Sequence, residues 1–161
     1  MKPVINLDDP KWETFASGPF EQRYAIISKH VGAIKLGYNL TVVPPGKMAC
    51  PFHNHRVNEE MFLILEGEGV LRFGEERFPL RPLDIIACPP GGREVAHQIK
   101  NTGATDLKYL SLSTNQPEEI CEYPDSDKVG IFVGDGAKPG LRLMFQAGKA
   151  VDYMVGEDGG A

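Results

Sequence analysis

The chain of 161 residues has little cysteine, no basic excess and no long apolar run. Its longest apolar stretch is "MFLIL", far shorter than the roughly 20 residues that cross a bilayer. The formal net charge of −5, with no basic patch or arm, argues against nucleic acid or a membrane surface as a partner. The opening "MKPVINLDDPKW" lacks the apolar segment of a secretory signal, so we expect a cytoplasmic location.

The cysteines are Cys50, Cys88 and Cys121, an odd number without the spacing of a metal or redox pair. In a cytoplasmic chain we expect them to be reduced. Because Cys50 stands close to two histidines in the sequence, a role as a reactive thiol stays open for it. The simpler interpretation is that Cys50 is a small buried residue.

Helical periodicity is scarce along the whole chain. Short runs rich in β-branched and aromatic residues, such as "KLGYNLTVV", "RYAIISKH" and "LKYLSLS", alternate with turn residues. The 18 glycines and 13 prolines interrupt the chain often enough to end a strand about every eight to twelve positions. This rhythm predicts an all-β sandwich or barrel. Within it, residues 66–80 predict a hairpin with Gly74 and Glu75 at the tip.

The stretch "EEMFLILEG" predicts a strand that is covered on both faces. Phe62 and Ile64 share one face, and the residues that alternate with them are also apolar. One face would meet the core. The other would meet either a second subunit, which predicts a homodimer, or the chain's own termini.

The segment "PFHNHRVNEEMF" places two histidines just before two acids and a buried strand. Side chains two apart on a strand point to the same side, about 6.5–7 Å apart, so His53 and His55 project together. A carboxylate that opens the next strand, Glu59 or Glu60, can meet both imidazoles, and strand alternation does not choose between them. Two imidazoles and a carboxylate form a site for a divalent transition metal. His97, in "VAHQIKN", is the candidate for a fourth ligand.

The segment "GKMACPFHNHRVNEEMFLILEGEG" resembles the first motif of the cupin superfamily, and "PLDIIACPPGGREVAHQIKN" resembles the second. Three departures stand out. Gly46 lies one residue further from His53 than usual, Asp84 follows Leu83 where the pattern prefers glycine, and "GGREVA" is about two residues longer than the usual gap. His97 and Asn101 fit the end of the second motif.

The resemblance implies a double-stranded β-helix, or jelly-roll barrel, forming a single cupin domain over 1–161. Its barrel core would span about 36–115, with N-terminal arm strands in 1–35 and a C-terminal extension in 116–161 whose last residues, "GEDGGA", are expected to be disordered. The resemblance also implies that one metal ion is held by four ligands: His53, His55, Glu60 and His97. The sequence does not distinguish Zn, Fe, Mn, Ni or Co.

Cupins host many chemistries, so the fold does not name the reaction. The first hypothesis is an enzyme that acts on a small molecule as a sugar or sugar-phosphate isomerase, because small cupins of that kind resemble this layout. The metal would orient adjacent carbonyl and hydroxyl oxygens while an unidentified base moves a proton. Cationic candidates for a phosphate clamp are Lys35, Arg72, Arg93 and Lys108. Further candidates for substrate contact are Tyr38, Phe62 and Tyr109.

Two alternatives stay open. An Fe- or Mn-dependent dioxygenase or oxidase is favoured by an apolar wall predicted from Phe62, Ile64, Val95 and Ile99. The other alternative is a non-catalytic, metal-dependent module that binds a small ligand.

Overall fold

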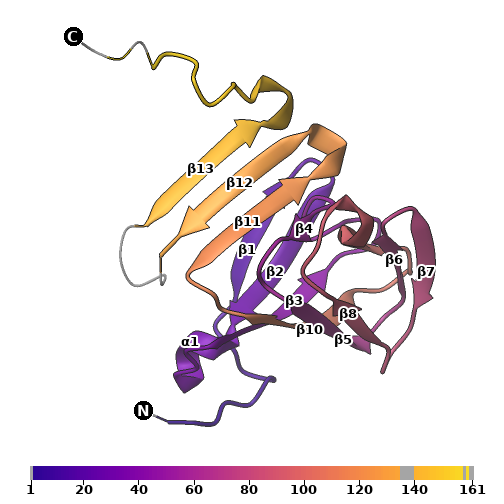
Figure 1. Ribbon diagram of the computed structural model, residues 1–161. Helices are drawn as coiled ribbons and strands as arrows, with labels where there is room; N and C mark the ends of the chain where they lie inside the picture. The colour runs from indigo at the N-terminus through magenta and orange to yellow at the C-terminus, as the bar shows by residue number, and fades with distance from the viewer. Residues whose placement is uncertain (1, 135–139, 158, 160–161) are drawn as a thin grey trace.

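The computed structural model describes residues 2–134, 140–157 and 159, and its regular secondary structure is mostly β-strands, arranged in two facing layers (Figure 1). The strands are β1 Glu13–Ser17, β2 Phe20–Ile26, β3 Leu36–Val43, β4 Asn54–His55, β5 Glu60–Glu66, β6 Gly69–Phe73, β7 Glu76–Leu80, β8 Ile85–Cys88, β9 His97–Asn101, β10 Leu107–Thr114, β11 Glu118–Tyr123, β12 Lys128–Val133 and β13 Leu141–Gln146. The helical turns are α1 Ile27–Val31, η1 Arg93–Val95, η2 Pro124–Ser126 and η3 Ala147–Lys149.

One layer is a sheet with the strand order β1-β2-β3-β10-β5-β8. The other consists of β13-β12-β11-β4 and β7-β6-β9, which an antiparallel bridge between His53 and His97 links edge to edge. All strand pairs are antiparallel. The predicted jelly-roll barrel is confirmed.

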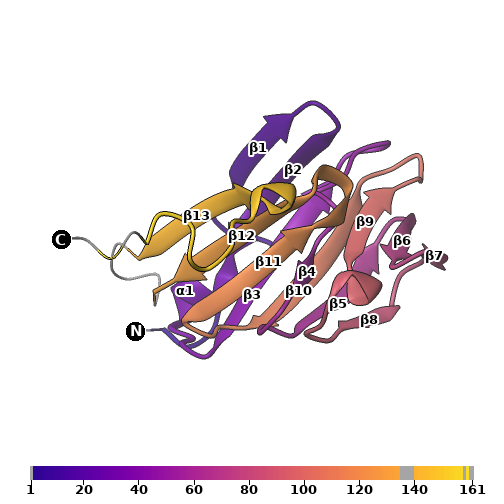
Figure 2. The same ribbon diagram turned by 45° about the horizontal axis from the view of Figure 1, so that its top comes forward.

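The C-terminal strands continue the barrel wall. β11 pairs with β4, opposing Cys121 to His55, and β12 and β13 extend the same sheet outward (Figure 2). Strands β11, β12 and β13 therefore lie in the sheet that carries the candidate ligand His55.

The core lies between the layers. Phe62 and Ile64 of β5 are buried there with Tyr109. The opposite face of β5 is covered at Leu65, which packs against a second cluster formed by Ala25, Ile27 and Leu40. Ile5 and Trp12 of the N-terminal segment pack against the same cluster. At this point N-terminal residues of the same chain cover the strand, which agrees with one of the two sequence alternatives.

Two details of the local prediction can be compared with the structure. The hairpin is confirmed, because β6 pairs with β7 and Gly74 and Glu75 lie between them. The strand expected from "RYAIISKH" is wrong in its second half. β2 ends at Ile26 and α1 follows, capped at its C-terminal end by Gly32, whose φ of 72° is the left-handed conformation that glycine adopts without strain.

Two observations concern the whole chain. Among the described residues, no helix has the length and apolar character needed to cross a membrane. The prediction for the tail 156–161 falls partly on residues 158, 160 and 161, which lie outside the described residues.

Candidate metal centre

Four side chains from separate segments converge inside the barrel. His53 immediately precedes β4, His55 ends it, Glu60 opens β5 and His97 opens β9. Their potential ligand atoms all lie within 4.8 Å of one another. Two donors on one ion are at most about 4.2 Å apart, twice a Zn–N bond, so small shifts would bring the four donors onto a common metal.

Glu60 stands at the centre of this cluster. Its Oε2 lies 3.0 Å from Nε2 of His97, 3.3 Å from Nε2 of His55 and 3.9 Å from Nε2 of His53. Glu59, the other acid left open by the sequence, is exposed and outside the cluster. The geometry thus singles out Glu60.

The outer nitrogens of two imidazoles face backbone carbonyls. Nδ1 of His53 lies 2.9 Å from the carbonyl oxygen of Pro51, and Nδ1 of His97 lies 3.3 Å from that of Val95. A carbonyl only accepts hydrogen bonds, so these contacts favour the tautomer with the proton on Nδ1. In that tautomer each Nε2 turns a lone pair toward the Glu60 carboxylate, an arrangement that a cation between them would stabilise.

The surroundings of His55 Nε2 indicate whether the residues of the cluster suit a metal ion. Its Nε2 is buried and, within the described part of the chain, makes no hydrogen bond of proper geometry. Leaving such a group without a partner costs about 1–3 kcal/mol. An orphaned imidazole nitrogen beside a carboxylate and two further imidazoles is a donor set that suits a divalent transition metal.

The other nitrogen of His55 meets groups from β11. Nδ1 lies 3.3 Å from Sγ of Cys121 and 3.4 Å from Oε2 of Glu119. The Glu119 carboxylate is itself held by the backbone N–H groups of Arg56, Val57, Asn58 and Ile120, at 2.8–3.1 Å. A fixed, buried carboxylate behind a histidine is the arrangement that orients metal ligands in proteins. Sequence reasoning missed it, because only the pairing of β11 with β4 brings Glu119 to His55.

The charges in the cluster are strongly coupled. Burial would raise the pKa of Glu60, but the neighbouring imidazoles of His55 and His97 outweigh it and hold that pKa well below its usual range. Burial, together with the neighbouring His97, lowers the pKa of His53 to about 4. For His55, burial favours the neutral ring, yet the contacts with Cys121 and Glu60 prevail and raise its pKa. The ionised form of Glu60 is therefore favoured at neutral pH.

The thiols near the cluster are held in the protonated form. The cysteines of the described chain are free, and Sγ of Cys50 lies 3.8 Å from Nδ1 of His53. Burial and the nearby Glu60 carboxylate raise the pKa of Cys50 to about 12, and burial likewise raises that of Cys88 to about 12. A thiolate nucleophile is therefore disfavoured at Cys50.

Aromatic rings form the walls around the cluster. The Phe62 ring lies edge-on to His97 and to Tyr109, with centroids 5.8 Å apart in both pairs. Tyr123, which sequence reasoning did not single out, stacks on His53 with centroids 6.1 Å apart. Of the predicted apolar wall, Phe62, Ile64 and Ile99 are buried in the core, whereas Val95 belongs to the turn η1.

The remaining candidates lie elsewhere or are engaged. Tyr38 packs against the cluster formed with the N-terminal segment, outside the four-residue cluster. Arg93 pairs with Asp127 at 2.8 Å, Arg72 with Asp125 at 2.6 Å, and Lys108 with Glu66 at 3.0 Å. For Lys35 the structure shows a backbone contact, in which its carbonyl accepts from Asn115 N–H. The three ion pairs weaken the case for a phosphate clamp at these positions.

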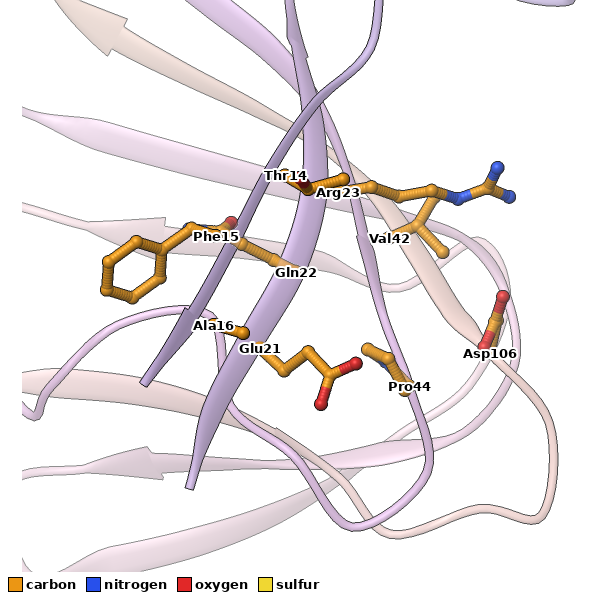
Figure 3. Close-up of a pocket in the computed structure, with 9 residues that line it drawn as sticks. All are labelled: Thr14, Phe15, Ala16, Glu21, Gln22, Arg23, Val42, Pro44 and Asp106. Atoms are coloured by element: carbon orange, nitrogen blue, oxygen red, sulfur yellow. The ribbon is translucent and has the colours of Figure 1, made fainter. Parts of the chain in front are cut away.

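A separate hollow of about 270 Å³ lies over β1 and β2 (Figure 3). Its lining includes the carboxylates of Glu21 and Asp106 and the side chain of Arg23, but no member of the metal cluster. The hollow is therefore separate from the candidate metal centre.

Comparison with known proteins agrees with this geometry. Residues 39–113 match the family described as "Cupin domain", and this segment contains all four clustered residues. The fold is the jelly-roll barrel of that family. The chain therefore carries a cupin domain over residues 39–113.

Two solved structures share the fold over almost the whole chain. One is a candidate sugar phosphate isomerase from Acidithiobacillus ferrooxidans, with 21% identity and a TM-score of 0.83, covering 94% of this chain and 96% of that one. The other is a sugar phosphate isomerase of the cupin superfamily from Silicibacter pomeroyi, with 22% identity and a TM-score of 0.78, covering 92% and 95%. At these identities the likeness shows the fold.

Curated relatives match over the barrel segment. An uncharacterised protein of Methanocaldococcus jannaschii is 36% identical over 83 residues, 52% of this chain and 56% of that protein. An oxalate-binding protein of Thermotoga maritima is 34% identical over 70 residues, 44% of this chain and 54% of that protein. The chain spans about half the length of the curated relatives it matches.

Proposed function

We propose that the protein is a metal-dependent cupin enzyme that acts on a small molecule as a sugar or sugar-phosphate isomerase. In this proposal one divalent transition metal is held by His53, His55, Glu60 and His97. The observation that carries it is the convergence of three Nε2 atoms on one carboxylate oxygen, at 3.0, 3.3 and 3.9 Å. The fold shared with the two sugar phosphate isomerase structures supports the choice of reaction.

The residues of this chain have definable tasks in such a reaction. A bound metal would polarise adjacent carbonyl and hydroxyl oxygens of the substrate. The carbonyls of Pro51 and Val95 hold the imidazole rings in place, and Phe62 and Tyr109 keep water from one side of the cluster. Tyr123 offers a ring face beside His53 for stacking against a substrate. We assign no catalytic base.

The test joins metal analysis to an assay under nitrogen. Purified protein should contain about one equivalent of a transition metal and interconvert an aldose phosphate and the corresponding ketose phosphate without oxygen. Turnover that occurs only with oxygen would contradict the isomerase and favour the dioxygenase or oxidase. The absence of bound transition metal from protein purified without chelators, and after incubation with Zn, Fe, Mn, Ni or Co, would contradict the metal centre itself.

A second candidate function is a metal-dependent binding module for small carboxylates. It is favoured by the relative that is named for oxalate binding. If this candidate holds, the metal-loaded protein should bind oxalate in a calorimetric titration and leave it unchanged over hours. Aldose phosphate turnover would exclude it.

Domain organisation belongs to the same proposal. We propose that residues 1–161 form one cupin domain, with the barrel core at about 36–115, and that the protein is a homodimer. Packing of the N-terminal segment against β5 and pairing of β11 with β4 support the single unit.

A further inference from the structure

The inner face of the C-terminal sheet carries a group of aromatic and cationic side chains beside the metal centre. Residues paired directly across antiparallel strands share a face. Cys121 pairs with His55 and with Gly130, so the face that looks into the metal centre continues onto β12. On this face, Tyr123 pairs with Lys128, and Phe132 pairs with Arg142.

Both cations on this face lie over aromatic rings. Nζ of Lys128 is 5.6 Å from the centroid of the Tyr123 ring, and the guanidinium of Arg142 is 4.8 Å from that of Phe132. Tyr123 in turn stacks on His53. The Lys128 ammonium is therefore at most about 12 Å from the His53 ring, since neither step exceeds 6.1 Å.

These two cations differ from the others near the barrel. Arg72, Arg93 and Lys108 each hold a carboxylate at 3.0 Å or less. Within the described ranges, no carboxylate lies within 4.0 Å of Lys128 or Arg142. A cation over a ring keeps its outward N–H donors available, so it can still bind an anion.

Gly130 makes room for this arrangement. A Cβ at this position would lie 2.8 Å from two atoms of the Phe132 ring and 3.2 Å from the Met144 methyl. The ring of Phe132 thus leans across the glycine toward the middle of the sheet. On the inner face the Phe132 ring therefore lies over Gly130, next to Met144.

We propose that Lys128 and Arg142, with Tyr123 between them and His53, form a subsite for the oxyanion group of a ligand held at the metal centre. The sugar ring would lie against Tyr123 and Phe132, and the phosphate would lie between the two cations. The identity of the oxyanion as a sugar phosphate rests on the proposed function, whereas the subsite itself does not.

The experiment measures anion binding by calorimetry, with inorganic phosphate and oxalate as separate probes. The double variant K128Q/R142Q should bind the preferred anion at least about tenfold more weakly, because each charged hydrogen bond lost is worth that much. R81Q is the control, since the Arg81 side chain is exposed and, among the described residues, its ion pair is with Asp84. The charge-conserving K128R/R142K should recover most of the affinity.

Metal content and thermal unfolding of each variant show whether the fold and the metal centre persist. Repeating the titrations after a chelator has removed the metal distinguishes anion binding by the two cations from direct coordination of the anion to the metal. We expect the metal-free protein to bind phosphate weakly and the double variant to lose this binding. Unchanged phosphate and oxalate affinities in K128Q/R142Q would overturn the subsite. An isomerase assay without turnover, together with anion binding lost in the double variant, would contradict the proposed function and support the subsite.

Discussion

At the scale of single residues, the candidate metal centre depends on which side of each imidazole is free. The carbonyl contacts of His53 and His97 use Nδ1, which leaves Nε2 for the cluster. Glu60 then faces three nitrogens, and its low pKa keeps it ionised at neutral pH. A carboxylate in this position attracts a cation, and a neutral amide would not.

Replacing Glu60 with glutamine should therefore abolish metal retention. The side chain keeps its shape, but it loses the charge that compensates a dication. Elemental analysis after desalting should show metal near background in E60Q. E59Q is the matched control, because Glu59 is exposed and its side chain lies outside the cluster. Equal metal content in the two variants would exclude Glu60 as a ligand.

Glu119 lies outside the cluster of four and contacts the candidate ligand His55 from behind. Its carboxylate receives backbone N–H groups from the loop after β4 and faces Nδ1 of His55. Removing an outer partner of a metal ligand lowers metal affinity by about 10–100-fold. We expect E119Q to show this loss in a competition with a chromophoric chelator, and to shift the absorption bands of the Co(II)-loaded protein.

The neighbouring E118Q provides the comparison for this test, since Glu118 points to the opposite face of β11. A merely structural role for Glu119 would lower the melting temperature and leave the Co(II) bands unmoved. That result would show that Glu119 anchors the loop but does not position His55.

At the scale of elements, the turn before β8 holds a leucine in a backbone conformation that favours glycine. Leu83 precedes β8 with φ of 75°, a left-handed conformation that costs a residue with a side chain roughly 1–2 kcal/mol. The side chain is 80% exposed, so it contributes little burial in return. This is the position where the cupin pattern prefers glycine.

The substitution L83G should consequently stabilise the protein. Relief of the strain is partly offset by the greater freedom of glycine in the unfolded chain, so we expect a gain of about 0.5–1 kcal/mol. The melting temperature should rise by roughly 2–3 °C for a chain of this size. The reverse change G67A should be destabilising, because Gly67 has φ of 82° and a Cβ there would collide with the backbone oxygen of Asp106. A lower melting temperature for L83G would refute the strain argument.

The pattern of elements also explains what the sequence could predict. His53, His55 and Glu60 lie within eight residues, and strand geometry with the cupin motif suffices to bring them together. Glu119 and Tyr123 come from β11, and their place depends on the register of β11 against β4, which no local pattern encodes. For the same reason the sequence offers Arg72 and Arg93 as candidate clamp residues, although Asp125 and Asp127 pair with them in the fold.

At the scale of the whole molecule, the metal centre joins the two layers of the barrel. Glu60 belongs to one sheet, while His55 and His97 belong to the two parts of the other. A metal bound by all of them would therefore stabilise the folded state as a whole. Ligand binding to the folded state alone adds about 4 kcal/mol when free metal exceeds the Kd about a thousandfold.

Chelation should accordingly lower the melting temperature of the protein by roughly 10 °C, at about 2–4 °C per kcal/mol. Differential scanning fluorimetry with and without chelator measures the shift. In E60Q, which should hold no metal, the chelator should have no effect. If the wild-type melting temperature is insensitive to chelator while metal is demonstrably removed, the metal does not couple the two sheets.

The proposed homodimer is placed most simply on the outer face of the C-terminal sheet. Ile120, Ile131 and Leu143 lie side by side there, and β13 is an edge strand that is exposed along its whole length. An open edge with an apolar face is a surface that natural proteins normally cover. Since the same strand presents both the edge and the apolar residues, a second copy of this chain related by twofold symmetry could cover both at once.

We therefore expect a dimer by light scattering after size exclusion, and a shift of L143D toward monomer by at least tenfold in Kd. I85D is the control, because Ile85 is 70% exposed on β8, the edge of the other sheet. Dissociation by I85D but not by L143D would move the interface to β8. A monomeric wild-type protein would refute the dimer, and the exposed face of β13 would then need another partner. The metal content of L143D should remain that of wild type, because Leu143 faces away from His55 on the opposite side of the sheet.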